Sequence, residues 1–491
     1  MNYKVLPQLS THFQQIELHK KIYEDEQEGY VNDELFEQLL EQWNNQLYDY
    51  IPEILSFIYK ELDYHKLNLH VLIKNNTVNI LHNILTSMCP LSEQAFNIII
   101  RIIEVCPQSL NVFLEETINF QDFLSSILEQ NAKETIAPGE FVFSHVFNYD
   151  CAYACKLICE SDHIKELYQK GFVIGIVACL KESFRDNMDN GDGSATNDIE
   201  IEKRYLDCLG SFLLNSDLDI ISNQQETLFI LEIYHIILKT KRLHLFEKAC
   251  TFLNTLMQKN PFLVDVFYNL HIMDDAYELT QDYIPTDYSL ASTFGFISQF
   301  LYYSNECVKE FAQKIDGSSI FGYIVEDINS IDDDRYDSIY TNAFILLINL
   351  VVELGEIPDD IFINDIANVI TVIMNEGRIE LKTSMMHFFL VYCEYCKADS
   401  LMELFTNDFI IPFFESLDGC EKDLFEVSLD TIERILSKIG RFSFEGEQEK
   451  YLMDVIIPRF LVSMIEAGDD EKCAAQQIMQ SYYPDFSDPE K

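Results

Sequence analysis

Glycine and proline are scarce in this sequence, which has 16 glycines and 12 prolines in 491 residues. Average usage gives roughly 34 glycines and 25 prolines for a chain of this length. Turn-rich β folds and α/β folds with glycine loops need more of both residues. The deficit therefore favours a mainly helical chain, in which long segments continue without a turn.

Basic residues are also few: 34 Lys and Arg stand against 82 Asp and Glu, a formal net charge of −48. The hydrophobic fraction of 48% is typical of a folded protein and exceeds that of disordered acidic chains. Nucleic acids and anionic membranes bind clustered Lys and Arg. We therefore expect no nucleic acid and no membrane as partners, whereas another protein, and a basic one in particular, suits this charge.

The sequence shows neither a secretory signal nor a membrane-spanning run. The segment Met1–Phe13 lacks a basic region followed by an apolar core. The most apolar run, 343–352, is interrupted by Asn349 and is shorter than the roughly 20 residues that cross a bilayer. The 13 cysteines lack paired spacing, which is typical of free thiols in a reducing compartment. We expect a cytoplasmic protein, with the nucleus as the alternative location.

One apolar pattern recurs along a chain that has helical periodicity almost throughout. The segment Ala343–Leu350 reads A-F-I-L-L-I-N-L, Ala95–Ile102 reads A-F-N-I-I-I-R-I, and Ala249–Leu256 reads A-C-T-F-L-N-T-L. Copies ending at 212, 256, 300, 350, 393 and 436 are 43–50 residues apart. This period is close to the roughly 40–47 residues of two- and three-helix repeats. The pattern therefore predicts a stack of helical repeats.

The order of a short helix, a second helix and a long third helix resembles the armadillo repeat. Ala343–Leu350 is similar to the third-helix consensus of that family, and HEAT repeats share the period. The resemblance implies an all-α, right-handed α-solenoid over residues 65–482, with an N-terminal helical cap over 1–64 and a C-terminal tail over 483–491. Nine long third helices are expected over 92–105, 147–160, 202–215, 243–258, 288–304, 336–354, 378–395, 422–438 and 469–482.

Residues 185–200, which are rich in Asp, Asn and Gly, predict a mobile acidic surface loop. Alignment of Gly193 with the invariant glycine of an EF-hand places Met188 and Ile199 where calcium needs oxygen ligands. A calcium site is therefore not expected in this loop.

Cysteines at two places have spacings that resemble metal-binding motifs, but neither arrangement by itself supports a metal site. A ladder with a spacing of four is formed by Cys151, Cys155, Cys159 and His163. On one helix the ladder spans about 18 Å, too far for all four to bind one zinc. Cys393 and Cys396 form a lone Cys-x-x-Cys without a βαβ context. Small buried core residues explain the ladder better, and neither redox chemistry nor zinc binding is well supported for the Cys-x-x-Cys pair. We expect no metal and no cofactor.

The sequence contains no nucleophile elbow, P-loop, His-Glu-x-x-His, kinase loop or dinucleotide fingerprint, so we expect no catalytic residues and no enzyme. Armadillo resemblance instead implies a concave groove of third helices that binds peptides or partner domains. The import adaptors of that family carry a ladder of Asn residues there, with Trp residues beside it. The equivalent positions in this sequence hold Arg101, Ser211, Thr255, Gln299 and Asn349.

Only Asn349 matches the adaptor ladder, and the single tryptophan, Trp43, lies outside the predicted repeats. The clamp for import signals is therefore not predicted. The remaining candidates for partner-binding groove residues are Ser211, Thr255, Gln299 and Asn349. Two functions fit: a non-catalytic scaffold or regulatory subunit that binds a partner protein, and a transport receptor or chaperone-like carrier for basic cargo proteins.

Overall fold

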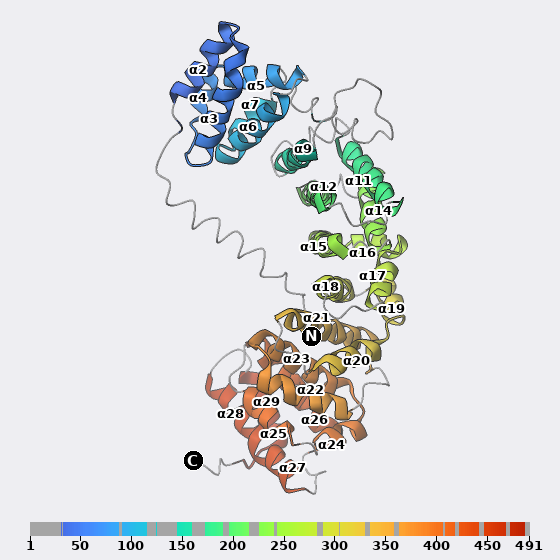
Figure 1. The fold of residues 1–491 in the computed structure, drawn as a ribbon. Coiled ribbons are helices and arrows are strands. Elements are labelled where there is room, and N and C mark those ends of the chain that lie inside the picture. The colour runs from blue at the N-terminus through green and yellow to red at the C-terminus, as the bar shows by residue number, and fades with distance from the viewer. Residues whose placement is uncertain are drawn as a thin grey trace. The chain divides into compact units, whose positions relative to one another are not determined.

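The computed structural model of the protein is helical (Figure 1). It describes residues 31, 33–87, 91–114, 124, 145–159, 172–189, 196–215, 225–239, 243–281, 288–303, 305–328, 334–357, 363–405, 408–417, 422–440, 446–467 and 472–486. These residues form helices and turns with no β-strand among them. The expected all-α class is therefore confirmed.

The described chain divides into two compact units that meet in sequence between Ile237 and Leu238. The helices of the N-terminal unit are α2 (Asp33–Asn44), η1 (Tyr48–Tyr50), α3 (Ile51–Leu62), α4 (Leu69–Lys74), α5 (Thr77–Thr86), α6 (Ser92–Val105), α7 (Ser109–Leu114), α9 (His145–Cys159), α11 (Phe172–Asp189), α12 (Thr196–Asn215) and most of α14 (Gln225–Lys239).

The C-terminal unit contains the remaining helices. They are α15 (Leu243–Lys259), α16 (Leu263–Asn269), α17 (Ile272–Gln281), α18 (Tyr288–Tyr302), α19 (Glu306–Ala312), α20 (Gly317–Asp327), α21 (Asp334–Leu354), α22 (Ile363–Glu376), α23 (Ile379–Tyr395), α24 (Ala398–Phe405), α25 (Ile410–Leu417), α26 (Lys422–Ile439), α27 (Glu447–Tyr451), the π-helical turn η3 (Leu452–Ile456), α28 (Ile457–Ala467) and α29 (Lys472–Tyr482).

Helix α3 shows how the N-terminal unit is built from its sequence. Pro52 lies in the first turn, where its missing N–H costs nothing. The buried side chains of the helix share one face, and they are Ile51, Ile54, Leu55, Ile58 and Leu62. This face packs against α2 and α6. Farther along the unit, α9 packs against both α6 and α12.

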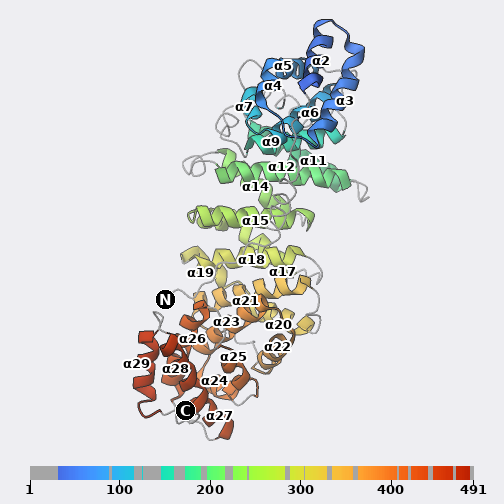
Figure 2. The same cartoon turned by 90° about the vertical axis from the view of Figure 1, so that its left-hand side faces the viewer.

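In the C-terminal unit, the long helices pack one against the next. Helix α15 contacts α18, α18 contacts α21, α21 contacts α23, α23 contacts α26, and α26 contacts α29. Figure 2 shows α15, α18 and α21 as successive layers. Every one of the nine long helices expected from the sequence coincides with an observed helix, from α6 to α29.

The ends of the helices carry the expected caps. The Asn305 side chain accepts the Val308 N–H at the start of α19, at 2.9 Å. Asp316 accepts the Ser318 and Ser319 N–H groups at the start of α20, at 3.1 and 3.2 Å. Gly355 follows α21 with a φ of +73°, a left-handed conformation that glycine adopts without a Cβ penalty. These signals explain why α19 and α20 begin, and α21 ends, where they do.

Helix α21 is a core helix of the C-terminal unit. Its window Asp337–Leu354 is long and apolar enough to cross a membrane, yet 61% of that window is buried inside the protein. Leu347 is 0% exposed, as expected from its place in the recurring pattern. The Phe344 ring lies 5.4 Å from that of Phe388 of α23, centroid to centroid, which joins the two helices through aromatic packing.

The predicted acidic loop over residues 185–200 is wrong at both of its ends. Helix α11 extends to Asp189 and α12 begins at Thr196. Residues 190–195 lie outside the described residues, and the predicted mobility is not tested. The two ends of the predicted loop continue as helix because Gly and Pro are absent from 185–189 and 196–200, while both glycines of the segment lie between them.

Candidate protein-interaction face on the long helices

The predicted groove residues are less exposed than a binding groove requires. Asn349 and Gln299 are 0% exposed, Ser211 is 8% exposed, and Thr255 is half-buried. A position in a binding groove implies solvent exposure, and for Ser211, Gln299 and Asn349 that implication is wrong. At these positions the side chains lie against other helices instead of facing solvent. A role for the four residues in partner binding stays a prediction.

Two of these side chains join neighbouring helices by hydrogen bonds. The Asn349 amide of α21 donates to the backbone carbonyl and the hydroxyl oxygen of Ser298 in α18, at 3.0 and 2.9 Å. The Gln299 carbonyl oxygen accepts from the Gln258 amide of α15 at 3.1 Å. A buried amide with these partners replaces the hydrogen bonds it would make to water. Both residues therefore connect long helices to each other.

The same arrangement recurs between other pairs of long helices. A side chain in one long helix, or directly after it, donates to a backbone carbonyl of the preceding long helix, 41–56 residues earlier in the chain. The four cases are Cys208 to Ala152 at 3.2 Å, Tyr303 to Met257 at 2.8 Å, Asn349 to Ser298 at 3.0 Å and Thr431 to Leu390 at 3.3 Å. Each bond fixes the register of two packed helices.

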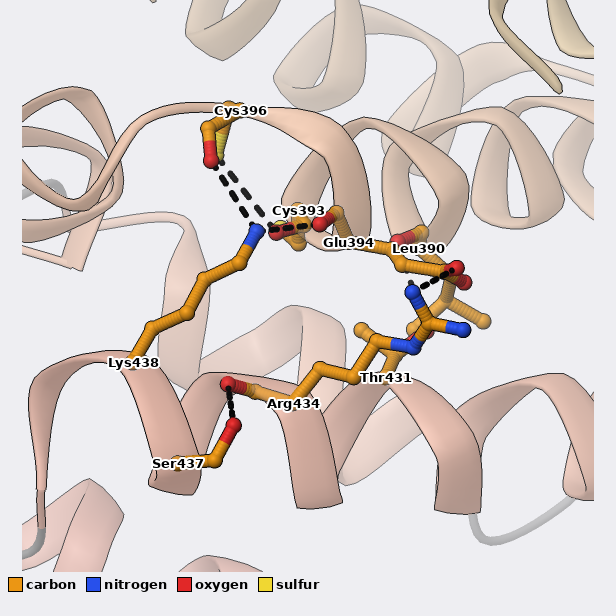
Figure 3. A network of polar contacts seen from close by, with 8 residues as sticks. All are labelled: Leu390, Cys393, Glu394, Cys396, Thr431, Arg434, Ser437 and Lys438. Atoms are coloured by element: carbon orange, nitrogen blue, oxygen red, sulfur yellow. Dashed lines mark hydrogen bonds and ion pairs between the residues drawn. The ribbon is translucent and has the colours of Figure 1, made fainter. Parts of the chain in front are cut away.

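Helices α23 and α26 share the most extensive of these polar contacts (Figure 3). The Lys438 ammonium reaches the last turn of α23 and donates to the carbonyls of Glu394 and Cys396, the latter at 3.0 Å. Arg434 Nη1 lies 2.7 Å from Glu394 Oε1, whose side chain is 0% exposed. Cations at a helix C-terminus pair with its free carbonyls and its dipole. The network therefore holds α26 against the end of α23.

The cysteines in these helices have the chemistry of buried, protonated thiols. Burial raises the pKa of Cys250 and of Cys179 to about 12, and that of Cys396 to about 11. Burial also raises the pKa of Cys393 well above its ordinary value. A thiol is a nucleophile or metal ligand only as its thiolate. These four cysteines are therefore buried core residues.

Among the described residues, no three His, Cys, Asp or Glu side chains are grouped as a metal site would require. Cys151 and Cys155 of the four-residue ladder are buried in α9, whereas His163 lies outside the described residues. The predicted absence of a metal is not tested by this result.

A half-exposed polar face is present on α6, α9 and α12 of the N-terminal unit. We define this polar face as Asp63, Arg101, Glu104, Asp150, Tyr153, Lys156, Arg204 and Asp207. The Arg101 guanidinium lies 3.1 Å from an Asp63 oxygen and 2.6 Å from a Glu104 oxygen. Through these ion pairs Arg101 connects the end of α3 to α6.

The α9 and α12 part of the polar face combines aromatic, acidic and basic groups. The Arg204 guanidinium stacks 4.3 Å from the centre of the Tyr153 ring. Lys156 Nζ lies 3.9 Å from an Asp207 oxygen. The Lys156 side chain is 29% exposed and that of Asp207 is 14% exposed, so this ion pair is partly buried. Tyr153 and Arg204 are partly exposed, so this part of the face can contact another molecule.

Asp150 is the carboxylate of the polar face whose charge is least compensated. Burial raises its pKa to about 6, against the opposing effect of Arg204, and the nearby charges of Glu104 and Glu93 raise it further. A raised carboxyl pKa means that the ionised form is destabilised by its surroundings. A lysine or arginine from a partner protein would compensate this charge.

Sequence reasoning identified Arg101 as a ladder position but missed Asp150, Tyr153 and Arg204. The signal was present, because Asp150 and Tyr153 are three residues apart in α9, and Arg204 and Asp207 are three apart in α12. Such pairs share one side of a helix. Their proximity across two helices, however, depends on how α9 and α12 pack.

No protein-family model and no curated protein sequence matches this chain.

Proposed function

We propose that the protein is a non-catalytic scaffold or regulatory subunit that binds a partner protein along its long helices. In this proposal the long helices form a right-handed α-solenoid of the armadillo type, and the protein acts in the cytoplasm or nucleus. Support for the repeat comes from the recurring hydrogen bond to the preceding long helix and from its 41–56-residue separation. A solenoid offers an extended surface for another protein.

The partly exposed cluster of Asp150, Tyr153 and Arg204 on α9 and α12 is the observation that carries the binding proposal, and the raised pKa of Asp150 supports it. A free carboxylate with a pKa of about 6 is partly desolvated before any partner arrives. A partner cation placed beside it gains an ion pair without paying the full desolvation penalty of the carboxylate. Arg204, which stacks on Tyr153, compensates only part of the Asp150 charge, because the pKa of Asp150 is still raised. We therefore expect the partner to present lysine or arginine to the polar face.

The net charge of −48 favours a second candidate function, a transport receptor or chaperone-like carrier for basic cargo. Long-range attraction speeds association with basic proteins and is weakened by salt. A carrier would release its cargo reversibly at about 0.5 M salt, whereas a scaffold with a packed interface would retain its partner. Capture of partners at two salt concentrations therefore separates the two functions.

The proposal is tested by partner capture with charge reversal on the polar face. Wild-type protein and the Asp150→Arg variant are immobilised, and bound proteins are identified and quantified by mass spectrometry. We expect at least one protein to bind wild type saturably and to be reduced about tenfold by Asp150→Arg. The Asp150→Asn variant, which removes the charge without adding one, should give a smaller reduction.

The matched control is Glu447→Arg, which makes the same charge change at an exposed position of α27. It should leave partner binding unchanged. Equal loss in both variants would show that only total charge matters, which favours the carrier. If a folded Asp150→Arg variant retains all partners, the polar face is not the binding site. If wild type binds no protein saturably, the proposed function itself is wrong.

A further inference from the structure

An exposed row of aromatic side chains lies along α3, on the side away from its buried face. Tyr50, Phe57 and Tyr64 are 58%, 48% and 62% exposed, and we call these three residues the aromatic strip. Tyr50 directly precedes α3, Phe57 lies within it, and Tyr64 follows it. Because they are seven residues apart, the three side chains lie on one side of the helix axis. Large exposed aromatic side chains that share one side of a helix are a candidate interaction site.

The surroundings of the aromatic strip are acidic. Besides Asp63, which pairs with Arg101 in the polar face, residues 47–64 contain three carboxylates, Asp49, Glu53 and Glu61, and a single base, Lys60. Glu53 is exposed and lies between Tyr50 and Phe57 on the same side of α3. Apolar groups bordered by acids match a ligand that has apolar groups bordered by bases.

The aromatic strip already binds one cation of its own chain. Lys60 Nζ lies 5.8 Å from the centre of the Phe57 ring, within the range of a cation–π contact. At the beginning of the strip, Trp43 and Tyr48 pack edge to face with centroids 5.5 Å apart. Ring faces that accept an ammonium group, next to carboxylates, suit lysine and arginine side chains of a ligand.

We infer that the aromatic strip is a docking surface for a basic amphipathic helix of a partner protein. The apolar side of the ligand helix packs on Tyr50, Phe57 and Tyr64, while its lysines and arginines lie over the neighbouring carboxylates. The seven-residue spacing matches the apolar spacing of such a helix. A second copy of this chain fits less well, because each copy carries a net charge of −48.

This inference rests on the proposed protein-binding function but uses a different surface from the polar face. The probe is a fluorescein-labelled synthetic peptide of Leu and Lys, with Leu at positions i, i+3 or i+4, and i+7. Its binding to the full chain is measured by fluorescence anisotropy. The triple variant Tyr50→Ser/Phe57→Ser/Tyr64→Ser keeps the net charge, so general attraction remains. We expect the triple variant to bind about tenfold more weakly.

Two controls isolate the strip. A peptide of the same composition without an apolar side should bind wild type and the triple variant equally. Phe262→Ser removes an aromatic side chain that is 89% exposed elsewhere in the chain and should leave binding unchanged. If the triple variant melts at a lower temperature, the single variant Phe57→Ser repeats the test, and it should weaken binding in the same direction.

Three results would overturn the inference. The triple variant could bind the peptide as wild type does. Wild type could sediment as a dimer that the triple variant converts to a monomer, which would make a second copy the occupant. Deletion of residues 1–30 could strengthen peptide binding about tenfold, which would make that segment the occupant. The Asp150→Arg variant tests the two surfaces separately. If it loses its partner proteins but still binds the peptide, the polar face and the aromatic strip are independent binding sites.

Discussion

At the scale of single residues, burial determines what each predicted site residue does. Asn349 and Gln299 are polar residues in apolar helices. In the sequence, such a residue can either face a solvent-filled groove or form a hydrogen bond with a neighbouring helix. The sequence could not separate the two, because the answer depends on whether a neighbouring helix supplies a partner such as Ser298. For Leu347 the sequence was unambiguous, because an apolar side chain within the apolar face of a helix is expected in the core.

Leu347→Ala is predicted to destabilise the protein strongly. The side chain is 0% exposed in α21, which packs between α18 and α23, so its removal leaves a cavity. Chemical denaturation should show a loss of about 2–5 kcal/mol. The control Ile379→Ala changes a residue that is 78% exposed and should stay within about 0.5 kcal/mol of wild type. A wild-type-like Leu347→Ala would place α21 outside the core.

Asp150→Asn is predicted to change how stability depends on pH. The folded-state pKa of Asp150 is raised to about 6, so between about pH 4 and pH 6 the folded state binds more protons than the unfolded state. Wild-type stability therefore falls through this window as pH rises. Because the group is partly solvated, the variant should be more stable by about 1–2 kcal/mol at pH 7.

The stability difference between wild type and Asp150→Asn should shrink as pH falls from about 6 to about 4, and it should vanish below about pH 3, where Asp150 is protonated in both the folded and the unfolded state. Other titrating groups are common to the two proteins and cancel in the comparison. Urea denaturation at several pH values measures the difference. A constant offset across this range would show that Asp150 titrates normally.

At the scale of helices, the sequence predicted most of what the structure shows. The expected range 92–105 coincides with α6, and the expected 336–354 differs from α21 only by an earlier start at Asp334. Periodicity located these helices because each buries one apolar side. It could not locate cross-helix contacts such as Arg434 with Glu394, since a charged pair is read from sequence as two exposed residues.

The pair Arg434 and Glu394 is predicted to matter through its buried member. Glu394 is buried, and Arg434 is half-exposed. Arg434→Met leaves the carboxylate without its guanidinium and should cost about 2–3 kcal/mol in denaturation experiments. The double variant Arg434→Met/Glu394→Met should recover at least about 1 kcal/mol of that loss.

The control for this pair is Lys450→Met, which removes a positive charge from an exposed position of α27. Its effect should stay within about 0.5 kcal/mol. If the double variant were no more stable than Arg434→Met, the loss of stability would come from the missing packing of the aliphatic part of Arg434 and not from the unpaired Glu394 carboxylate.

At the scale of the whole molecule, charge is the most unusual property. Composition revealed the net charge of −48 directly, but it did not reveal where that charge is compensated. The structure shows local compensation at sites such as Lys314 with Asp274, at 2.8 Å, and incomplete compensation at Asp150. Charge placement depends on tertiary packing, which is why the polar face could not be found from sequence alone.

Salt is therefore predicted to stabilise the folded protein. Excess carboxylates repel one another more in the compact state than in the expanded chain, and salt screens that repulsion. Raising sodium chloride from about 10 mM to about 300 mM at pH 7 should raise the Tm by about 2 °C or more. Near the isoelectric point of about 4.4, where net charge approaches zero, the same change in salt should have little effect. A Tm at pH 7 that falls with salt would mean that attractive ion pairs outweigh the repulsion, and a partner would then need to recognise shape more than charge.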